Sequence, residues 1–153
     1  MQNPVVIIRH PKEKIAKCSL RNLHDREGFE FFKAHPDFHF DASGHLLLTM
    51  EGPPLSQEDR GHPLLLLDST WRLLPQLLRC LRGNPLRRSI PTKIRTAYPR
   101  FSKLTPDPPQ GLASIEALYV AKRILGDDDP SLLEGYYWKD SFLKQFSLRN
   151  QNG

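Results

Sequence analysis

The sequence of 153 residues is poor in cysteine and has no apolar run near the ~20 residues that a membrane-spanning helix needs. Cys18 and Cys80 are far apart and belong to no Cys-x-x-Cys pair, which argues against a zinc site and a disulfide framework. The N-terminus lacks a charged region followed by a long apolar one, so we expect no signal peptide. These absences predict a cytoplasmic protein with no membrane partner and no metal.

Acidic residues are absent from Ser69 to Pro106, although this stretch contains nine lysines and arginines. The formal net charge of the whole chain is +5. A long basic block without acids is typical of a surface that binds a polyanion, most often a nucleic acid. The alternative is a solvated basic face with no partner. The sequence also lacks a glycine-rich phosphate loop, an internal repeat and a nucleophilic triad.

Two apolar segments predict buried strands. Pro4 to Arg9 is rich in β-branched residues, and Leu64 to Leu67 is a continuous apolar run of the kind found inside parallel sheets. Helical patterns follow them, so we predict one small α/β domain over residues 1–153, a mostly parallel sheet flanked by helices, with residues 150–153 frayed. The other expected elements are helices over Asp25–Lys33, in the leucine-rich segment after Asp68, from Gly111 to Leu125 and from Ser131 onward, and strands over Phe38–Phe40, His45–Met50 and Ile90–Arg95.

Polar residues follow the central strand directly: Asp68, Ser69 and Thr70, and then Trp71. In open α/β sheets, ligands bind in the crevice beyond the carboxyl ends of the strands, so this sequence predicts a site there. The alternative is that Asp68, Ser69 and Thr70 only cap the following helix. His10 follows the first strand in the same way. It could act as a ligand or a base, or it could be an ordinary turn residue.

The segment Asp68-Ser69-Thr70-Trp71 resembles the Asp-x-Thr-Trp motif of the DTW-domain tRNA-uridine aminocarboxypropyltransferases. It is also similar to the Asp-Cys-Ser-Trp motif of the related enzymes that modify small-subunit rRNA. Four further segments resemble motifs of one or both groups, in the same order along the chain: His10-Pro11-Lys12-Glu13, Lys17-Cys18-Ser19, Leu112-Ala113-Ser114-Ile115-Glu116-Ala117 and Glu134–Leu143.

The resemblance implies a fold related to the knotted (SPOUT-like) methyltransferases, with a C-terminal trefoil knot. It also implies an enzyme that transfers the 3-amino-3-carboxypropyl (acp) group from S-adenosylmethionine to N3 of a uridine or pseudouridine, releasing methylthioadenosine. The acceptor would be structured RNA, with tRNA favoured over rRNA by His10-Pro11 and Thr70. We expect a monomer.

The same resemblance assigns roles to residues. Asp68 is the candidate general base, because it is the one acid at the strand tip. The methyl group of the donor would pack against Leu48, Met50 and Trp71. Backbone groups near Leu67 and Ile94 would hold the adenosine, and groups near Ser19 and Ser114 the carboxylate of the donor. The residues expected to bind RNA phosphates are Lys17, Arg21, Arg95 and Arg100.

Two other functions remain open at this point. A methyltransferase of the same knotted class would use the same donor and transfer a different carbon. A non-catalytic RNA-binding or ribosome-assembly module would keep the fold and the basic block without the reaction.

Overall fold

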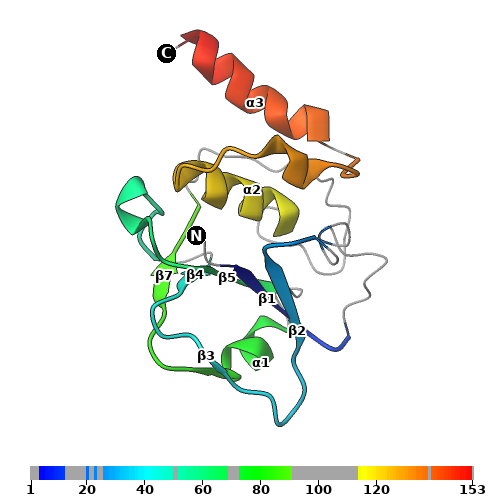
Figure 1. Ribbon diagram of the computed structural model, residues 1–153, viewed down its shortest axis with the longest axis vertical. Coiled ribbons are helices and arrows are strands. Elements are labelled where there is room, and N and C mark those ends of the chain that lie inside the picture. The colour runs from blue at the N-terminus through cyan, green and yellow to red at the C-terminus, as the bar shows by residue number, and fades with distance from the viewer. Residues whose placement is uncertain are drawn as a thin grey trace.

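The computed structural model describes residues 4–12, 20, 23, 26–49, 52–68, 73–90, 114–137 and 139–152 of the chain. Within these ranges the helices and strands follow one another in the order shown in Figure 1. They are β1 (Val5–Arg9), β2 (Phe29–Lys33), β3 (Phe40–Asp41), β4 (Leu46–Leu48), the 3-10 helix η3 (Gln57–Asp59), β5 (Leu64–Asp68), α1 (Leu74–Leu78), β6 (Leu81–Arg82), β7 (Leu86–Arg88), α2 (Ser114–Ile124), the 3-10 helix η4 (Pro130–Leu133) and α3 (Lys139–Asn152).

Five of the strands form one sheet in the order β2-β1-β5-β4-β7, and every neighbouring pair in it is parallel. All the carboxyl ends therefore lie at the same edge of the sheet. β1 and β5 are the strands that the sequence predicted as buried, and every one of their residues is buried. The small strands β3 and β6 pair with each other in a second, two-stranded sheet.

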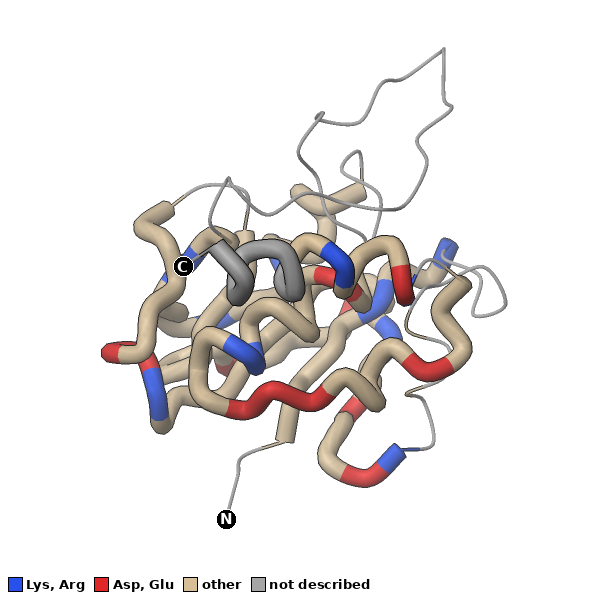
Figure 2. Tube along the Cα trace, turned by 90° about the horizontal axis from the view of Figure 1, so that it is seen from above, with Lys and Arg blue, Asp and Glu red and all other residues tan. Residues whose placement is uncertain are grey.

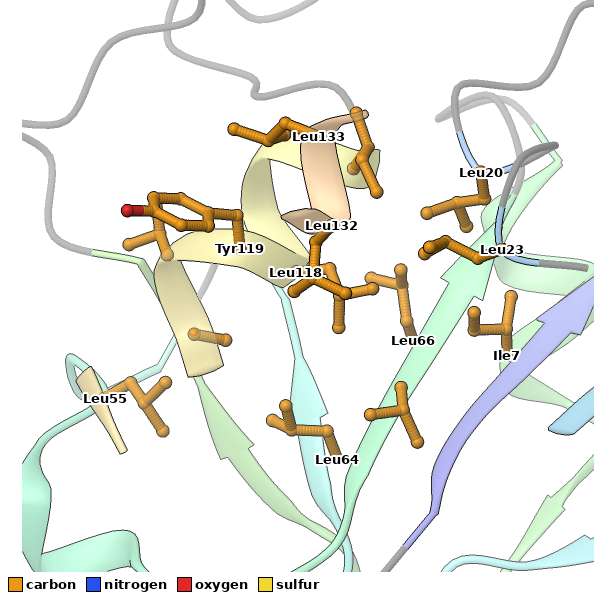
Figure 3. Packing of buried hydrophobic residues seen from close by; sticks show 14 of the residues in the cluster. Ile7, Leu20, Leu23, Leu55, Leu64, Leu66, Leu118, Tyr119, Leu132 and Leu133 are labelled. Carbon is orange, nitrogen blue, oxygen red and sulfur yellow. The ribbon is translucent and has the colours of Figure 1, made fainter. Parts of the chain in front are cut away.

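Side chains of the central strands alternate between two hydrophobic cores. Ile7 and Leu66 point to the core under α2 and η4, which Figure 3 shows from close by. Ile8 and Leu65 point to the opposite core, which is covered by α1. The predicted parallel sheet flanked by helices is thereby confirmed. An apolar residue at every position of β1 and β5 is what a strand covered on both faces requires.

The predicted helix over Asp25–Lys33 is wrong, because Phe29 to Lys33 form strand β2 instead. Phe29 and Phe31 pack against the core under α2, whereas Phe32 packs against the opposite core. The sequence Phe-Glu-Phe-Phe-Lys therefore alternates faces, and its aromatic residues favour a strand once a partner is available. The parallel register with β1, Ile7 opposite Phe31, supplies that partner.

The second half of the chain differs in part from the expectation. Two strands follow α1 in the described residues, first the short β6 and then β7 (Leu86–Arg88) of the main sheet, whereas the predicted strand over Ile90–Arg95 stays a prediction, because residues 91–95 lie outside the described ranges. Ser131 lies inside η4, and the last helix begins only at Lys139, so Ser131 does not cap that helix. Phe142 in this helix is fully buried, whereas Tyr137 precedes the helix and is 85% exposed.

Other details agree with the sequence. Pro75 lies in the first turn of α1, where its missing N–H costs no hydrogen bond. Gly126 has a φ of +100° just beyond the end of α2 (Ser114–Ile124), as expected of a C-terminal stop. No helix within the described part of the chain has the length and apolar character to cross a membrane. The trefoil knot stays a prediction, because residues 91–113, which lead into α2, lie outside the described ranges.

The turn at Gly83 joins the small sheet to the main one and yields a test of the fold. Gly83 has a φ of +78°, and a Cβ added there would collide with the hydroxyl of Ser43 and lie 2.7 Å from Oδ1 of Asp41. This carboxyl accepts the backbone N–H of Ser43, the main cause of the lowered pKa of Asp41. Gly44 has nearly the same φ, +77°, but faces open space.

We predict that Gly83→Ala lowers the free energy of unfolding by about 2 kcal/mol more than Gly44→Ala, as measured by urea denaturation. Alanine is strained to a similar degree at both positions, because both have nearly the same positive φ. The difference between the two losses in the free energy of unfolding therefore measures the effect of the contacts with Ser43 and Asp41. Equal losses in the two variants would show that the small sheet does not pack as described.

Candidate active site at the carboxyl edge of the sheet

The connections of the sheet diverge at the carboxyl ends of β1 and β5. The chain leaves β1 toward β2, at one end of the sheet, whereas it leaves β5 toward β7, at the other end. Such a switch point opens a crevice beyond the carboxyl ends of the strands and is the usual ligand site of open α/β sheets. The last residues of the two strands, Arg9 and Asp68, are register partners here.

An ion pair joins these two residues. Nε of Arg9 donates to Oδ2 of Asp68 at 3.2 Å, and the two side chains are only 7% and 9% exposed. The guanidinium also lies over the ring of Phe31, with Cζ 5.4 Å from the ring centroid. A buried charge pair is strongly destabilised when one partner is removed. This pair therefore fixes the ends of β1 and β5 relative to each other.

The first residue of α2 is bound to the same carboxylate. The hydroxyl of Ser114 donates to Oδ1 of Asp68 at 3.2 Å, while Arg9 occupies Oδ2. Both oxygens of Asp68 thus accept hydrogen bonds from residues distant in the sequence. Two of the predicted site residues, Asp68 and Ser114, are brought together. The N-terminal end of α2, which carries a partial positive charge, is positioned at the crevice.

His10 serves the structure of the adjoining turn. Its Nδ1 accepts the backbone N–H of Lys12 at 3.1 Å, so the neutral ring carries its proton on Nε2 and donates to Oε1 of Gln76 in α1, 2.8 Å away. The ring is buried, with the residue 5% exposed. These contacts agree with the interpretation of His10 as a turn residue.

Another buried acid, Glu116, lies in the first turn of α2. Glu116 is fully buried, and the hydroxyl of Tyr136 donates to its Oε2 at 3.1 Å. This hydrogen bond ties α2 to the segment that leads into α3 (Lys139–Asn152). Glu116 lies in one of the segments that carry the family resemblance, but the sequence alone gave it no role.

The structure describes only part of the predicted site. Leu48 ends β4 and packs against the core under α2, whereas the side chain of Leu67 belongs to the opposite core. Arg9, in contrast, was missed, although a charged residue ends an apolar strand there just as Asp68 does in β5. The predicted residues that lie outside the described ranges are Lys17, Ser19, Arg21, Met50, Trp71, Ile94, Arg95 and Arg100.

Charges of both signs are mixed over the described part of the chain, as Figure 2 shows. Within the acid-free stretch, Arg79, Arg82 and Arg87 are exposed, but Arg88 forms an ion pair with Asp59 at 3.2 Å. The described residues alone therefore do not form a single basic face. Every residue predicted to bind RNA lies outside the described ranges, so the assignment of these residues stays a prediction.

Two residues near η4, Tyr119 and Asp129, have shifted pKa values, and both lie away from this edge of the sheet. Burial is the largest cause that raises the pKa of Tyr119, and its hydrogen bond to Asp128 adds to the rise. The hydroxyl of Ser131 is the main cause that lowers the pKa of Asp129, and Arg26 contributes to it. Arg26 pairs with Asp129 at 2.8 Å. These shifts reflect contacts that anchor the loop after α2.

No group of three or more His, Cys, Asp or Glu side chains suited to a metal ion occurs in the described ranges. Among the described residues at this edge, the guanidinium of Arg9, the hydroxyl of Ser114 and the start of α2 are donor groups, and the carboxylate of Asp68 is an acceptor. This combination can bind a small molecule that carries an anionic group.

The fold is similar to that of a solved structure, the SAM-dependent rRNA:acp-transferase Tsr3 from Vulcanisaeta distributa. The TM-score is 0.69, and the match covers 99% of this chain and 80% of that one at 24% sequence identity. The chain shares the fold of this transferase. No protein-family model matches the sequence, and no curated protein matches it either. The likeness to Tsr3 therefore concerns the arrangement of the chain.

The Arg9–Asp68 pair can be tested through stability. We predict that Asp68→Asn lowers the free energy of unfolding by about 3 kcal/mol, because it leaves a buried guanidinium without its counter-charge. The double variant Arg9→Met/Asp68→Asn should regain a large part of this loss, since it removes both charges. Urea denaturation of the wild type, both single variants and the double variant gives the coupling energy. Additive losses would mean that the two side chains are not paired.

Proposed function

We propose that this protein transfers the acp group of S-adenosylmethionine to N3 of a uridine or pseudouridine in structured RNA. The observation that carries the proposal is the meeting of Arg9, Asp68 and Ser114 at the carboxyl ends of β1 and β5, in a fold shared with Tsr3. The order of the motifs along the chain supports the same reaction. The likeness to Tsr3, an rRNA:acp-transferase, favours rRNA as the acceptor, whereas His10-Pro11 and Thr70 favour tRNA.

The chemistry requires an activated carbon and an activated nucleophile. The sulfonium of the donor activates each of its three attached carbons. In the proposed reaction N3 gives its proton to a base, Asp68 in one of the two roles considered below and solvent water in the other. N3 then attacks the carbon of the acp arm that is bonded to sulfur, and the bond between that carbon and sulfur breaks. Its electron pair goes to sulfur, which leaves neutral methylthioadenosine. The enzyme selects among the three carbons by placing only one of them in line with the nucleophile.

The proposed placement of the donor follows from the crevice. The arm would lie at Asp68 and Ser114, with the carboxylate toward the start of α2. The methyl group would face Leu48, together with Met50 and Trp71, and would thus be shielded from the RNA. The adenosine would bind backbone groups near Leu67 and Ile94. Lys17, Arg21, Arg95 and Arg100 would contact phosphates, which positions the RNA without reading its sequence.

Asp68 has two candidate roles. The sequence predicts a general base, which would contribute about 10²–10⁴-fold to the rate. The contacts of the carboxylate favour a positioning role, because a proton transferred to it would break its ion pair with Arg9 or its hydrogen bond with Ser114. In that role Asp68 holds Arg9 and Ser114 where the donor binds.

We predict that Asp68→Asn weakens the binding of S-adenosylmethionine more than it lowers kcat, with kcat at saturating donor reduced less than about 10²-fold. Steady-state kinetics together with calorimetric titration of the donor separate the two effects. Ser56→Ala, at the exposed cap of η3, is a suitable control for handling and folding. A kcat loss of 10²-fold or more at unchanged donor affinity would instead establish the general base.

The reaction itself is tested by mass spectrometry of nucleosides. Purified protein is incubated with S-adenosylmethionine and, separately, with tRNA and small-subunit rRNA, each unmodified or already carrying other modifications. We expect an acp adduct on a uridine or pseudouridine of one of the two RNAs, with methylthioadenosine as the second product.

A methyl adduct would establish the methyltransferase alternative and overturn the placement of the donor. RNA binding without any adduct, in the presence of bound donor, would establish the non-catalytic module. The monomeric state and the cytoplasmic location are predictions that this experiment leaves untouched.

A further inference from the structure

Among the described residues at the carboxyl edge, Arg9 has a side chain whose hydrogen-bond donors are not all used by the fold. It is the last residue of β1, 6% exposed, and lies on the face covered by α2. Its guanidinium has donor groups on three nitrogens in a rigid planar fork. Nε is bonded to Asp68, and the plane rests near the ring of Phe31.

Nη2 of Arg9 is the unsatisfied part of this fork. It is buried, and within the described part of the chain it has no hydrogen-bond acceptor. Because the atom is shielded from solvent, bulk water does not supply the acceptor either. A buried donor on a charged group without a partner raises the free energy of the folded state. A ligand that brings an acceptor to Nη2 therefore gains an advantage that an exposed arginine does not offer, and because Nη2 is closed to water in this structure, neighbouring groups must shift for the ligand to reach it.

A second, independent observation points to an anion. α2 spans eleven residues and begins at Ser114, whose hydroxyl is bonded to the same carboxylate as Arg9. The N-terminus of such a helix attracts negative charge through its free N–H groups and its dipole. The single carboxylate of Asp68 thus holds a guanidinium on one oxygen and a helix start on the other. An anion placed beside it meets both.

We propose that Nη2 of Arg9 binds the α-carboxylate of the acp arm and that Arg9 is a donor-specificity residue of this enzyme. The inference rests on the proposed function. The carboxylate is the one anionic group of S-adenosylmethionine, because the sulfonium and the amine are cationic and the adenosine is neutral. A guanidinium N–H to a carboxylate is a strong, charge-assisted hydrogen bond. Held at this point, the arm has a fixed end, which aligns its other end with the nucleophile.

Binding of an RNA phosphate by Arg9 fits the structure less well. A phosphate of a polymer approaches from outside and pairs best with exposed cations, and Arg79, Arg82 and Arg87 are exposed in the same chain. Arg9 is buried beside the switch point of the sheet, where small ligands bind.

The test uses three nucleosides: S-adenosylmethionine, its decarboxylated analogue, which differs from it only in the carboxylate, and methylthioadenosine, which lacks the arm and with it the positive charge on sulfur. Calorimetric titration without RNA gives their affinities for the wild type, for Arg9→Gln and for the control Arg60→Gln. Arg60 is exposed and lies beside Gly126, beyond the far end of α2 from Ser114. The same substitution is thus made at a buried and at an exposed arginine.

We expect the wild type and Arg60→Gln to bind S-adenosylmethionine about 10- to 100-fold more tightly than the decarboxylated analogue. In Arg9→Gln this preference should fall to about threefold or less, while methylthioadenosine keeps its affinity. A preference that survives in Arg9→Gln, or one that is absent from the wild type, overturns the proposal.

Arg9→Lys covers the case in which Arg9→Gln does not fold. Lysine keeps a positive charge opposite Asp68 but lacks the second planar nitrogen, so the preference should fall while circular dichroism shows an intact fold. An unchanged preference in Arg9→Lys overturns the proposal. If none of the nucleosides binds the wild type, the proposed function fails as a whole. If the donor binds with the expected preference but RNA receives no acp group, the role of Arg9 stands and the reaction does not.

Discussion

The parallel pairing of β1 with β5 is the constraint on which the rest of the structure depends. It places Arg9 beside Asp68, 59 residues further along the chain, at the edge where all five strands of the sheet end. Without its partner, each of these two residues would be an unpaired buried charge, which destabilises the folded state. Paired, they close the carboxyl ends of the two central strands and give α2 a point of attachment through Ser114. The site and the stability of this edge therefore have the same origin.

The two faces of the sheet are held by different kinds of contact. The face covered by α1 is closed by apolar packing and by the hydrogen bond between His10 and Gln76. The face covered by α2 carries Arg9, Asp68 and Ser114 at one end and the ion pairs around η4 at the other. Because side chains alternate along a strand, one residue of shift in β1 would turn Arg9 into the other core, and the same shift in β5 would turn Asp68. The register of these strands is thus a condition for any chemistry at the crevice.

Much of this could be predicted from the sequence. The apolar runs of β1 and β5 leave few alternatives to buried parallel strands, and Gly126 and Pro75 mark helix boundaries through backbone geometry that is local. Asp68 and Ser114 were both found, the first from its place after a strand and the second from resemblance. Arg9 was overlooked because its sequence neighbours suggest only the end of a strand. The importance of Arg9 comes from its ion pair with Asp68, which the residues around Arg9 in the sequence do not indicate.

The errors have a common cause. The segment Phe29–Lys33 fits a helix as well as a strand by local pattern, and the free edge of β1 decided in favour of the strand. Ser131 has the spacing of a cap for a long helix, yet Asp129 and Arg26 hold it in η4. The sequence by itself determined the class of the fold, its central strands and the acid at the strand tip, because these follow from burial and from local backbone chemistry. Only the tertiary structure decided which distant residues share that edge, since the partner of a buried charge is chosen by strand register and helix placement.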